Sequence, residues 1–285
     1  MKVHHFNCGT FCPLGELFIN GSGSPLSSGK LVCHCFAVET PQGIVLVDTG
    51  LGTQDIAEPI ESLPGPMWQA INRAQLELDE TMVRQLEGRG IRPEDVRHIV
   101  LTHLDFDHAG GLADFPHAEV HVWREEHEAA NHPRKWIDHE RYARRQFVHQ
   151  PNWHLHDLEM GEKWMDFDAV RPIPGVDPDI LLIPLPGHSR GHCGVAVRSS
   201  SGWILHAGDA FFHHAELRPG HRECPAGLRV YQNVFQDDRT LRKHNQERLR
   251  ELAQSSGDRV RILCSHDPDQ LAMYQPAESN RAYVS

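Results

Sequence analysis

The chain has 285 residues, 39% of them hydrophobic, and its 28 basic and 39 acidic residues give a formal net charge of −11. This negative charge argues against a nucleic-acid partner, because phosphates need a basic surface. The length fits one large domain or two small ones. No apolar run is long enough to cross a membrane, and residues 1–8 lack an apolar signal region. We therefore expect a cytoplasmic protein without a membrane partner.

In chain order, the first apolar segments are 31–37 and 43–47, which flank a Pro/Gly turn and predict a β-hairpin. The spacing of apolar residues over 67–88 predicts a helix. Short apolar runs at 99–101 and 120–122 predict two further strands.

The second half of the chain repeats this alternation. Apolar runs at 181–183, 195–197 and 203–205 predict three strands, and 260–264 predicts the last one. Between them, the amphipathic pattern of 238–254 predicts a helix.

Segment 124–172 is the least regular part of the sequence and contains several aromatic and His residues. One interpretation is a lid or substrate wall over a small-molecule site. The other is an insertion that packs on the rest of the domain, or on a second subunit in a homodimer. Its basic residues Arg141, Arg144 and Arg145 are most simply interpreted as a solvated helix face.

The cysteine count is seven, and an odd number argues against a complete disulfide framework. Cys8, Cys12, Cys33 and Cys35 are close enough in sequence to hold a structural zinc through four thiolates. The alternative is reduced thiols that pack as small apolar groups, as in cytoplasmic proteins. We favour packing.

Segment 102–108 places four metal-capable side chains directly after an expected strand: His103, Asp105, Asp107 and His108. Residues alternate in direction along an extended chain, so the first three can share one side. A chain with 22 His will contain some clusters by chance. A packed core, however, has no use for carboxylates and imidazoles at this spacing, whereas a metal site needs them.

Three further candidates, His188, Asp209 and His266, each follow an apolar strand that runs into a Gly or polar turn. Ligands at strand ends are held by a rigid sheet while the open side stays accessible. In this order, the four segments resemble the metallo-β-lactamase superfamily of metal-dependent hydrolases, whose pattern is H-x-H-x-D-H, Gly-His, Gly-Asp and a last His. The turn Asp48-Thr49-Gly50 matches that family's early D-T-G.

The resemblance covers about residues 30–270. It implies a single α+β domain over 1–285, folded as a four-layer αββα sandwich around two divalent metal ions. It assigns His103, Asp105 and His188 to the first metal, Asp107, His108 and His266 to the second, and Asp209 to both. Two such ions can hold and activate a water molecule, which Asp107, the candidate catalytic residue, would orient.

One position departs from the family pattern, because Asp105 stands where the second His is usual. A carboxylate is a harder ligand than imidazole, so zinc remains the first expectation but manganese or iron are alternatives. The superfamily's flavo-diiron branch also places a carboxylate there. Asp105 can alternatively fall short of the metal, because its side chain is shorter than that of His.

The activity that we expect is hydrolysis of a small ester or lactone, since the phrase 105–111 looks closest to acyl-homoserine-lactone hydrolases. Those enzymes carry a Tyr shortly after the bridging Asp, but this sequence has Phe212 there. The alternatives are a thioester hydrolase of the hydroxyacylglutathione type, a di-iron redox protein with a separate electron donor, and a binding module without activity. We find no G-x-S-x-G serine-hydrolase motif.

Overall fold

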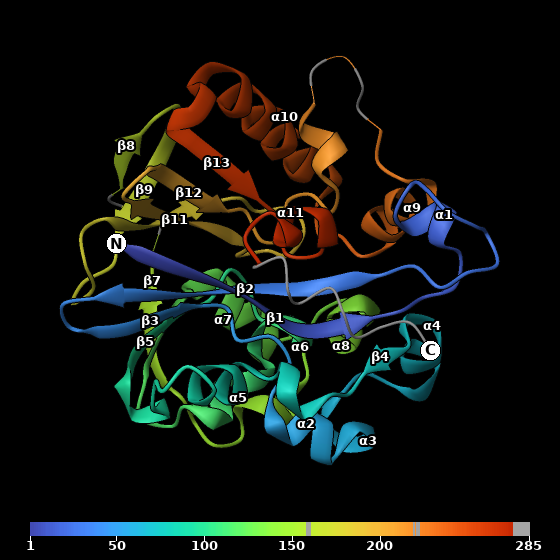
Figure 1. The fold of residues 1–285 in the computed structure, drawn as a ribbon, viewed down its shortest axis with the longest axis horizontal. Coiled ribbons are helices and arrows are strands. Elements are labelled where there is room, and N and C mark those ends of the chain that lie inside the picture. The colour runs from blue at the N-terminus through green and yellow to red at the C-terminus, as the bar shows by residue number, and fades with distance from the viewer. Residues whose placement is uncertain (158–160, 219, 221–222, 276–285) are drawn as a thin grey trace.

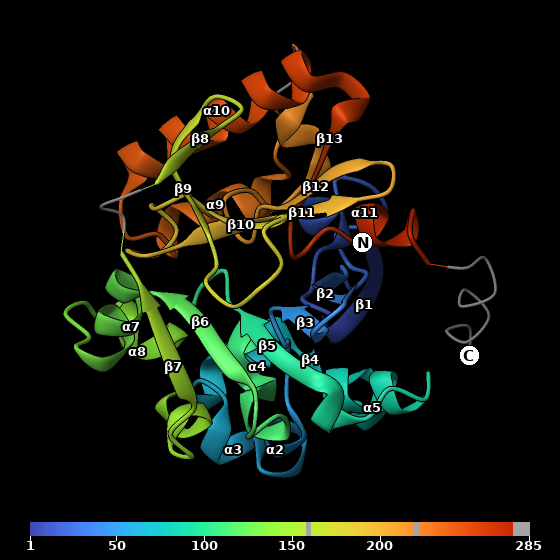
Figure 2. The same cartoon turned by 90° about the vertical axis from the view of Figure 1, so that its left-hand side faces the viewer.

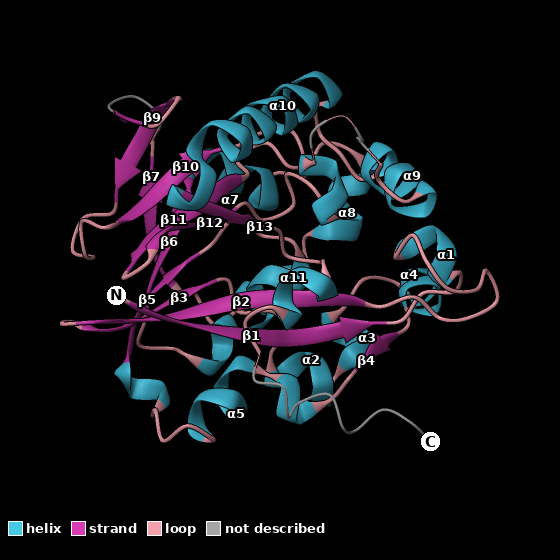
Figure 3. Ribbon diagram, turned by 45° about the horizontal axis from the view of Figure 1, so that its top comes forward, coloured by secondary structure: helices cyan, strands magenta, loops and turns pink. Residues whose placement is uncertain are grey.

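The computed structural model describes residues 1–157, 161–218, 220 and 223–275. Within them, two β-sheets lie face to face and helices cover their outer faces (Figure 1, Figure 3). This arrangement is the αββα sandwich that the resemblance implied. In the same part of the chain, no helix is both long and apolar enough to span a membrane.

The first sheet has seven strands in the order β4-β1-β2-β3-β5-β6-β7. They are β1 (Lys2–Phe11), β2 (Leu31–Thr40), β3 (Gly43–Val47), β4 (Ala74–Gln75), β5 (Val96–Val100), β6 (Glu119–Trp123) and β7 (Asn152–His156). Strands β1, β2 and β3 are antiparallel, whereas β3, β5, β6 and β7 run parallel. The carboxyl ends of the parallel strands therefore open at one edge of the sheet, where loops can carry functional side chains.

The second sheet has six strands in the order β13-β12-β11-β10-β9-β8. They are β8 (Glu162–Trp164), β9 (Phe167–Pro172), β10 (Ile180–Pro184), β11 (Cys193–Ser199), β12 (Gly202–His206) and β13 (Val260–Leu263). Because side chains alternate along a strand, one face of each sheet is free to meet the other. Val45 and Val47 of the first sheet share a buried core with Leu182 and Val195 of the second.

The helices are α1 (Glu16–Ile19), α2 (Thr53–Ala57), α3 (Pro59–Ser62), α4 (Pro66–Asn72), α5 (Met82–Glu87), α6 (Phe106–Ala109), α7 (Arg124–Asn131), α8 (Trp136–Arg141), α9 (Ala226–Val234), α10 (Arg239–Ser256) and α11 (Pro268–Ala272). Helix α10 confirms the prediction for 238–254. The side chain of Asp238 caps it by accepting from the backbone N–H groups of Thr240 and Leu241, and Leu249 and Leu252 are buried against the second sheet.

The predicted strands are confirmed, but the single helix predicted over 67–88 is wrong. The chain instead forms α4, the short strand β4 and then α5. Arg73 follows α4 with a φ of 51°, a left-handed conformation that ends a helix. Ala74 and Gln75 then pair with β1. Pairing with β1 stabilises an extended backbone at Ala74 and Gln75, and this interrupts the helix that the apolar spacing favours. The spacing of apolar residues carries no information about a partner strand.

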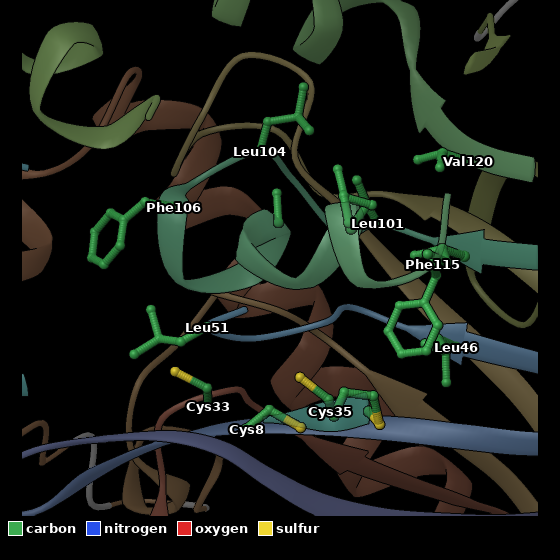
Figure 4. Packing of buried hydrophobic residues seen from close by; sticks show 14 of the residues in the cluster. Cys8, Cys33, Cys35, Leu46, Leu51, Leu101, Leu104, Phe106, Phe115 and Val120 are labelled. Atoms are coloured by element: carbon green, nitrogen blue, oxygen red, sulfur yellow. The ribbon is translucent and has the colours of Figure 1, made fainter. Parts of the chain in front are cut away.

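The cysteine thiols are all free. Cys8, Cys33 and Cys35 lie in the buried cluster between the first sheet and its outer helices, close to Leu51 (Figure 4). Among the described residues, no metal-capable group combines these thiolates with one another. Cys8, Cys33 and Cys35 thus pack as small apolar groups in this cluster, and Cys12 is half-buried.

Segment 124–172 is built into both sheets, since β7 is the edge strand of the first and β8 that of the second. Its exposed Trp136 contacts the ring of Phe235, and Trp153 packs against Phe147. Neither Trp contacts a candidate ligand, whereas α7 and α8 do reach the loops that carry them, as described below.

Candidate metal centre

The seven candidate ligands lie at the carboxyl ends of four strands. The loop after β5 carries His103 and Asp105, and the short helix α6 that follows carries Asp107 and His108. The loops after β10, β12 and β13 carry His188, Asp209 and His266. Six of the seven are at most 8% exposed, and Asp107 is slightly more open. The structure therefore brings together all the site residues that the sequence suggested.

One group consists of His103, Asp105 and His188. The Oδ2 atom of Asp105 lies 3.0 Å from Nε2 of His188 and 3.5 Å from Nε2 of His103. One ligand atom of each residue can approach a common point. Asp105 thus occupies the place of an imidazole ligand and reaches the group, although its side chain is shorter than that of His.

The other group consists of Asp107, His108 and His266. Oδ2 of Asp107 lies 3.7 Å from Nε2 of His266, and Oδ1 of Asp107 lies 4.0 Å from Nε2 of His108. The thiol of Cys33 also lies near Asp107 and His266. Burial raises the pKa of this thiol well above its usual value, and Asp107 adds to the effect, so it remains a neutral S–H group.

Asp209 lies between the two groups. Its Oδ1 is 3.3 Å from Nε2 of His108, and its Oδ2 is 3.1 Å from Nε2 of His266 and 3.5 Å from Nε2 of His188. Its Oδ1 therefore faces His108, and its Oδ2 faces both His266 and His188, so the carboxylate contacts side chains of both groups.

Several buried polar atoms of these side chains have no hydrogen-bond partner: Nε2 of His103, Nε2 of His108, Oδ1 of Asp105 and Oδ1 of Asp209. Buried polar atoms in native proteins are nearly always paired. Imidazole nitrogens and carboxylate oxygens are also the donor set of divalent transition metals. The residues present therefore fit the metal ions that the fold implies.

The electrostatics keep Asp209 and His188 ready to bind cations. At His108 and His266 burial lowers the pKa, but Asp209 outweighs it and raises the pKa of both imidazoles, so a metal would displace a proton there. Burial opposes ionisation of Asp209, but His266 and His108 outweigh it and hold the pKa of Asp209 well below its usual range. Burial lowers the pKa of His188 to about 4, and Arg141 contributes in the same direction. Asp209 is thus an anion and His188 a neutral imidazole near pH 7.

A second layer of hydrogen bonds orients the ligands. Asp48 accepts from Nδ1 of His108 at 2.8 Å and from the backbone N–H of Thr102 at 2.7 Å. Nδ1 of His266 donates to the carbonyl of Val32 at 2.8 Å. The backbone N–H of Asp209 donates to Nε2 of His192 at 2.9 Å. Such partners fix the tautomer and direction of metal ligands. Asp48 therefore gives the D-T-G turn a role that the sequence did not show.

Glu126 of α7 connects two ligand loops. Its carboxylate accepts from the backbone N–H of Leu104 at 3.1 Å, from the hydroxyl of Ser189 at 2.7 Å and from the N–H of Gly191 at 2.9 Å. Leu104 lies next to His103 and Ser189 next to His188. No sequence motif marks Glu126, because its partners are distant along the chain.

Arg141 of α8 corrects the interpretation of the basic residues as a solvated face. Its side chain is 3% exposed, and its Nη1 lies 3.4 Å from Oδ1 of Asp105. Arg145, by contrast, is exposed and pairs with Glu58 and Glu61. Burial raises the pKa of Asp105, but Arg141 and then His103 outweigh it, so the pKa lies well below its usual range.

Tyr231 of α9 is a further residue that the sequence did not single out. Its ring lies 5.6 Å from that of Phe212, the residue at the family's Tyr position. Burial, followed by Asp107, Asp105 and Asp209, raises the pKa of the Tyr231 phenol well above its usual value. The hydroxyl is therefore protonated and within electrostatic range of the candidate ligands.

Tyr231 also lines an apolar cavity of about 500 Å³. It lies among α1, α4 and α9, and its lining includes Leu14, Ile71, Leu228, Val234 and Phe235. Tyr231 is thus shared between the metal-ligand cluster and an apolar space that could take an organic chain.

Comparisons with known proteins agree with this geometry. The family model of the metallo-beta-lactamase superfamily matches residues 28–266. A probable metallo-hydrolase of Mycobacterium tuberculosis is 40% identical over 277 residues, which cover 97% of this chain and 83% of that protein. An N-acyl homoserine lactonase of Bacillus cereus is 29% identical over 203 residues, which cover 70% of this chain and 72% of that protein.

A solved structure of an N-acyl homoserine lactone hydrolase, with N-hexanoyl-L-homoserine at its catalytic metal centre, is similar with a TM-score of 0.69. The sequence identity is 25%, and the match covers 96% of both chains. The chain therefore belongs to the metallo-beta-lactamase superfamily, as a metallo-hydrolase with lactonases among its relatives.

Proposed function

We propose that this enzyme hydrolyses a small lactone or ester with an apolar chain at a centre of two divalent metal ions. The metal that we expect is zinc. In this proposal His103, Asp105 and His188 hold one ion, Asp107, His108 and His266 hold the other, and Asp209 binds both. The observation that carries the proposal is the position of Asp209, whose carboxylate lies within 3.5 Å of His108 and His266 of one group and of His188 of the other.

When bound, divalent ions supply Lewis acidity and lower the pKa of a coordinated water to about 7. The side chain of Asp107 is slightly more open than the other ligands and is positioned to orient the attacking water. It would accept the proton of that water and return it to the alcohol oxygen when the acyl C–O bond breaks.

Tyr231 takes the role that Phe212 cannot perform. A phenol O–H near the ligand carboxylates can donate a hydrogen bond to the substrate carbonyl, and such donors stabilise the charge that develops on oxygen. The apolar cavity that Tyr231 lines suits the chain attached to that carbonyl. The lactonase names among the relatives support a substrate of this class.

Arg141 supports zinc as the metal. An ionised Asp105 adds one negative charge relative to a neutral His, and the buried guanidinium beside it adds one positive charge. The pair therefore has the same net charge as the imidazole that the family usually places there. The hard-ion preference of a lone carboxylate is offset in this way.

The test combines metal analysis with a substrate series. We expect about two zinc ions per chain in protein purified without added metal, and hydrolysis of N-acyl homoserine lactones or aryl esters with KM decreasing as the acyl chain lengthens. Val234→Lys in the cavity should raise KM for long chains, whereas Val148→Lys, on an exposed site elsewhere, should not. Activity that survives confirmed metal removal contradicts the proposal, and bound iron with oxygen-dependent turnover favours the redox alternative.

A further inference from the structure

A second group of metal-capable side chains lies on the first sheet, apart from the candidate metal centre. It consists of His98 on β5, Glu119 and His121 on β6, and His154 on β7. These three strands lie side by side (Figure 2), with His98 paired to Glu119 and His121 paired to His154 in the parallel register. Paired residues of neighbouring strands project to the same face of a sheet.

That face is the one that meets the second sheet. His98 pairs with Val45, and Val45 belongs to the core shared by the two sheets. An apolar side chain is expected on such a face, because burying an imidazole is unfavourable unless it is paired. His121 is buried and lies within hydrogen-bond distance of His98 and of His156, so the group is either a chain of imidazoles or the site of a cation.

The distances within the group fit a single ion. Nδ1 of His98 is 3.0 Å from Nε2 of His121 and 3.6 Å from Oε2 of Glu119, and this Oε2 is 3.5 Å from Nε2 of His154. Ligand atoms bound tetrahedrally at about 2.0–2.1 Å from zinc are about 3.4 Å apart. The three residues His98, Glu119 and His121 can direct one atom each to a common point.

The neighbouring contacts set His121 in the protonation state that a ligand needs. Its Nδ1 lies 3.0 Å from Nε2 of His156, so an Nδ1–H can donate there and leave the Nε2 lone pair for the group. The side chains of Glu119 and His154 are 41% and 42% exposed, which gives an ion a path from solvent.

We propose that Nδ1 of His98, Oε2 of Glu119 and Nε2 of His121 form a second, structural zinc site, and that the half-exposed His154, whose Nε2 lies 3.5 Å from this Oε2, turns toward them as the fourth ligand. Four protein ligands close the coordination sphere, as in structural rather than catalytic zinc sites. The ion would link the edge strand β7 to β6 and β5, and this stabilises the sheet edge because only the folded chain presents the ligands together.

The experiment compares zinc content and thermal stability. In Glu119→Ala/His154→Ala, both half-exposed ligands are removed without opening the core; in the control His117→Ala, an exposed His before β6 is removed. We expect the double variant to hold one zinc fewer per chain by elemental analysis and to have a lower Tm, with lactone or ester hydrolysis retained. The control should match the wild type in all three.

An Asp209→Ala variant separates this site from the candidate metal centre, because it should lose zinc there and still bind the ion between β5 and β7. Replacing zinc by cobalt in that variant should give the visible absorption of tetrahedral cobalt, and adding the Glu119→Ala/His154→Ala changes should remove it. Equal zinc content in the wild type and the double variant, with both folded by circular dichroism, overturns the proposal. The group would then be a hydrogen-bonded chain of imidazoles alone.

Discussion

The guanidinium of Arg141 lies 3.4 Å from the carboxylate of Asp105, and both side chains are buried. None of the three guanidinium nitrogens has a hydrogen-bond partner, and among the described residues Asp105 is the acidic residue that forms an ion pair with Arg141. Asp105 departs from the family pattern, and Arg141 supplies the opposite charge. The two residues form one electrostatic unit, because Arg141 would be an unpaired buried charge without Asp105.

This unit predicts strong coupling between the two positions. Arg141→Met should reduce the unfolding free energy by about 3–5 kcal/mol, as expected when one partner of a buried pair is removed. Asp105→His alone should also destabilise the protein, whereas Asp105→His/Arg141→Met should recover most of the stability and zinc binding. Denaturant unfolding and elemental analysis measure the cycle. The control is Arg145→Met, which removes half-exposed ion pairs with Glu58 and Glu61 and should lower the free energy of unfolding by less than about 1 kcal/mol. Additive effects of Asp105→His and Arg141→Met would refute the coupling.

Tyr231→Phe should reduce kcat by about 10²-fold, the usual cost of losing one hydrogen-bond donor to a developing oxyanion. Zinc content and Tm should remain close to the wild-type values, because the ring that packs on Phe212 is kept. Tyr274→Phe, the same chemical change on a residue that stacks on His5, is the control. An unchanged kcat in Tyr231→Phe would show that the hydroxyl does not act on substrate.

Glu126→Gln should destabilise the protein by about 1.5–3 kcal/mol, the range for hydrogen bonds to charged groups. The amide retains one acceptor oxygen and directs an NH₂ group at N–H or O–H donors from Leu104, Ser189 or Gly191. Because these donors flank metal ligands, zinc affinity should fall as well. The neighbouring exposed residue provides the control Glu125→Gln, which should change neither property. Titration with a zinc chelator measures the affinity.

The stability should fall as the pH decreases below about 6.5. Burial, with His206 second, lowers the pKa of His5 in the folded state to about 3. Between this value and the unfolded value of about 6.5, the unfolded chain binds more protons, so acid favours unfolding. Lowering the pH from 7 to 5 should reduce the free energy of unfolding by up to about 2 kcal/mol through His5 alone. His5→Phe should reduce the difference in unfolding free energy between pH 7 and pH 5, and exposed His117→Phe should not; equal differences in all three proteins would refute this assignment.

Local sequence determined much of this protein. Strands β2, β3, β5, β6 and β10 to β13, helix α10 and the seven candidate ligands could be predicted, because hydrophobic periodicity and motif spacing are properties of short segments. Strands β1, β4, β7, β8 and β9 were not predicted. The order of the motifs along the chain was sufficient to identify the family. The helix expected over 67–88 was wrong because the pairing of Ala74 and Gln75 with β1 involves a strand far away in sequence.

Only the tertiary structure decided which other residues serve the site. Arg141 looked like part of a solvated face until α8 placed it against Asp105, 36 positions earlier in the chain. Tyr231 lies on a helix with no motif, and its relation to the ligands depends on how α9 packs against Phe212. The group around His121 likewise exists only because parallel pairing aligns β5, β6 and β7. Such contacts join residues that are distant along the chain, and their energies depend on burial, which a linear pattern does not specify.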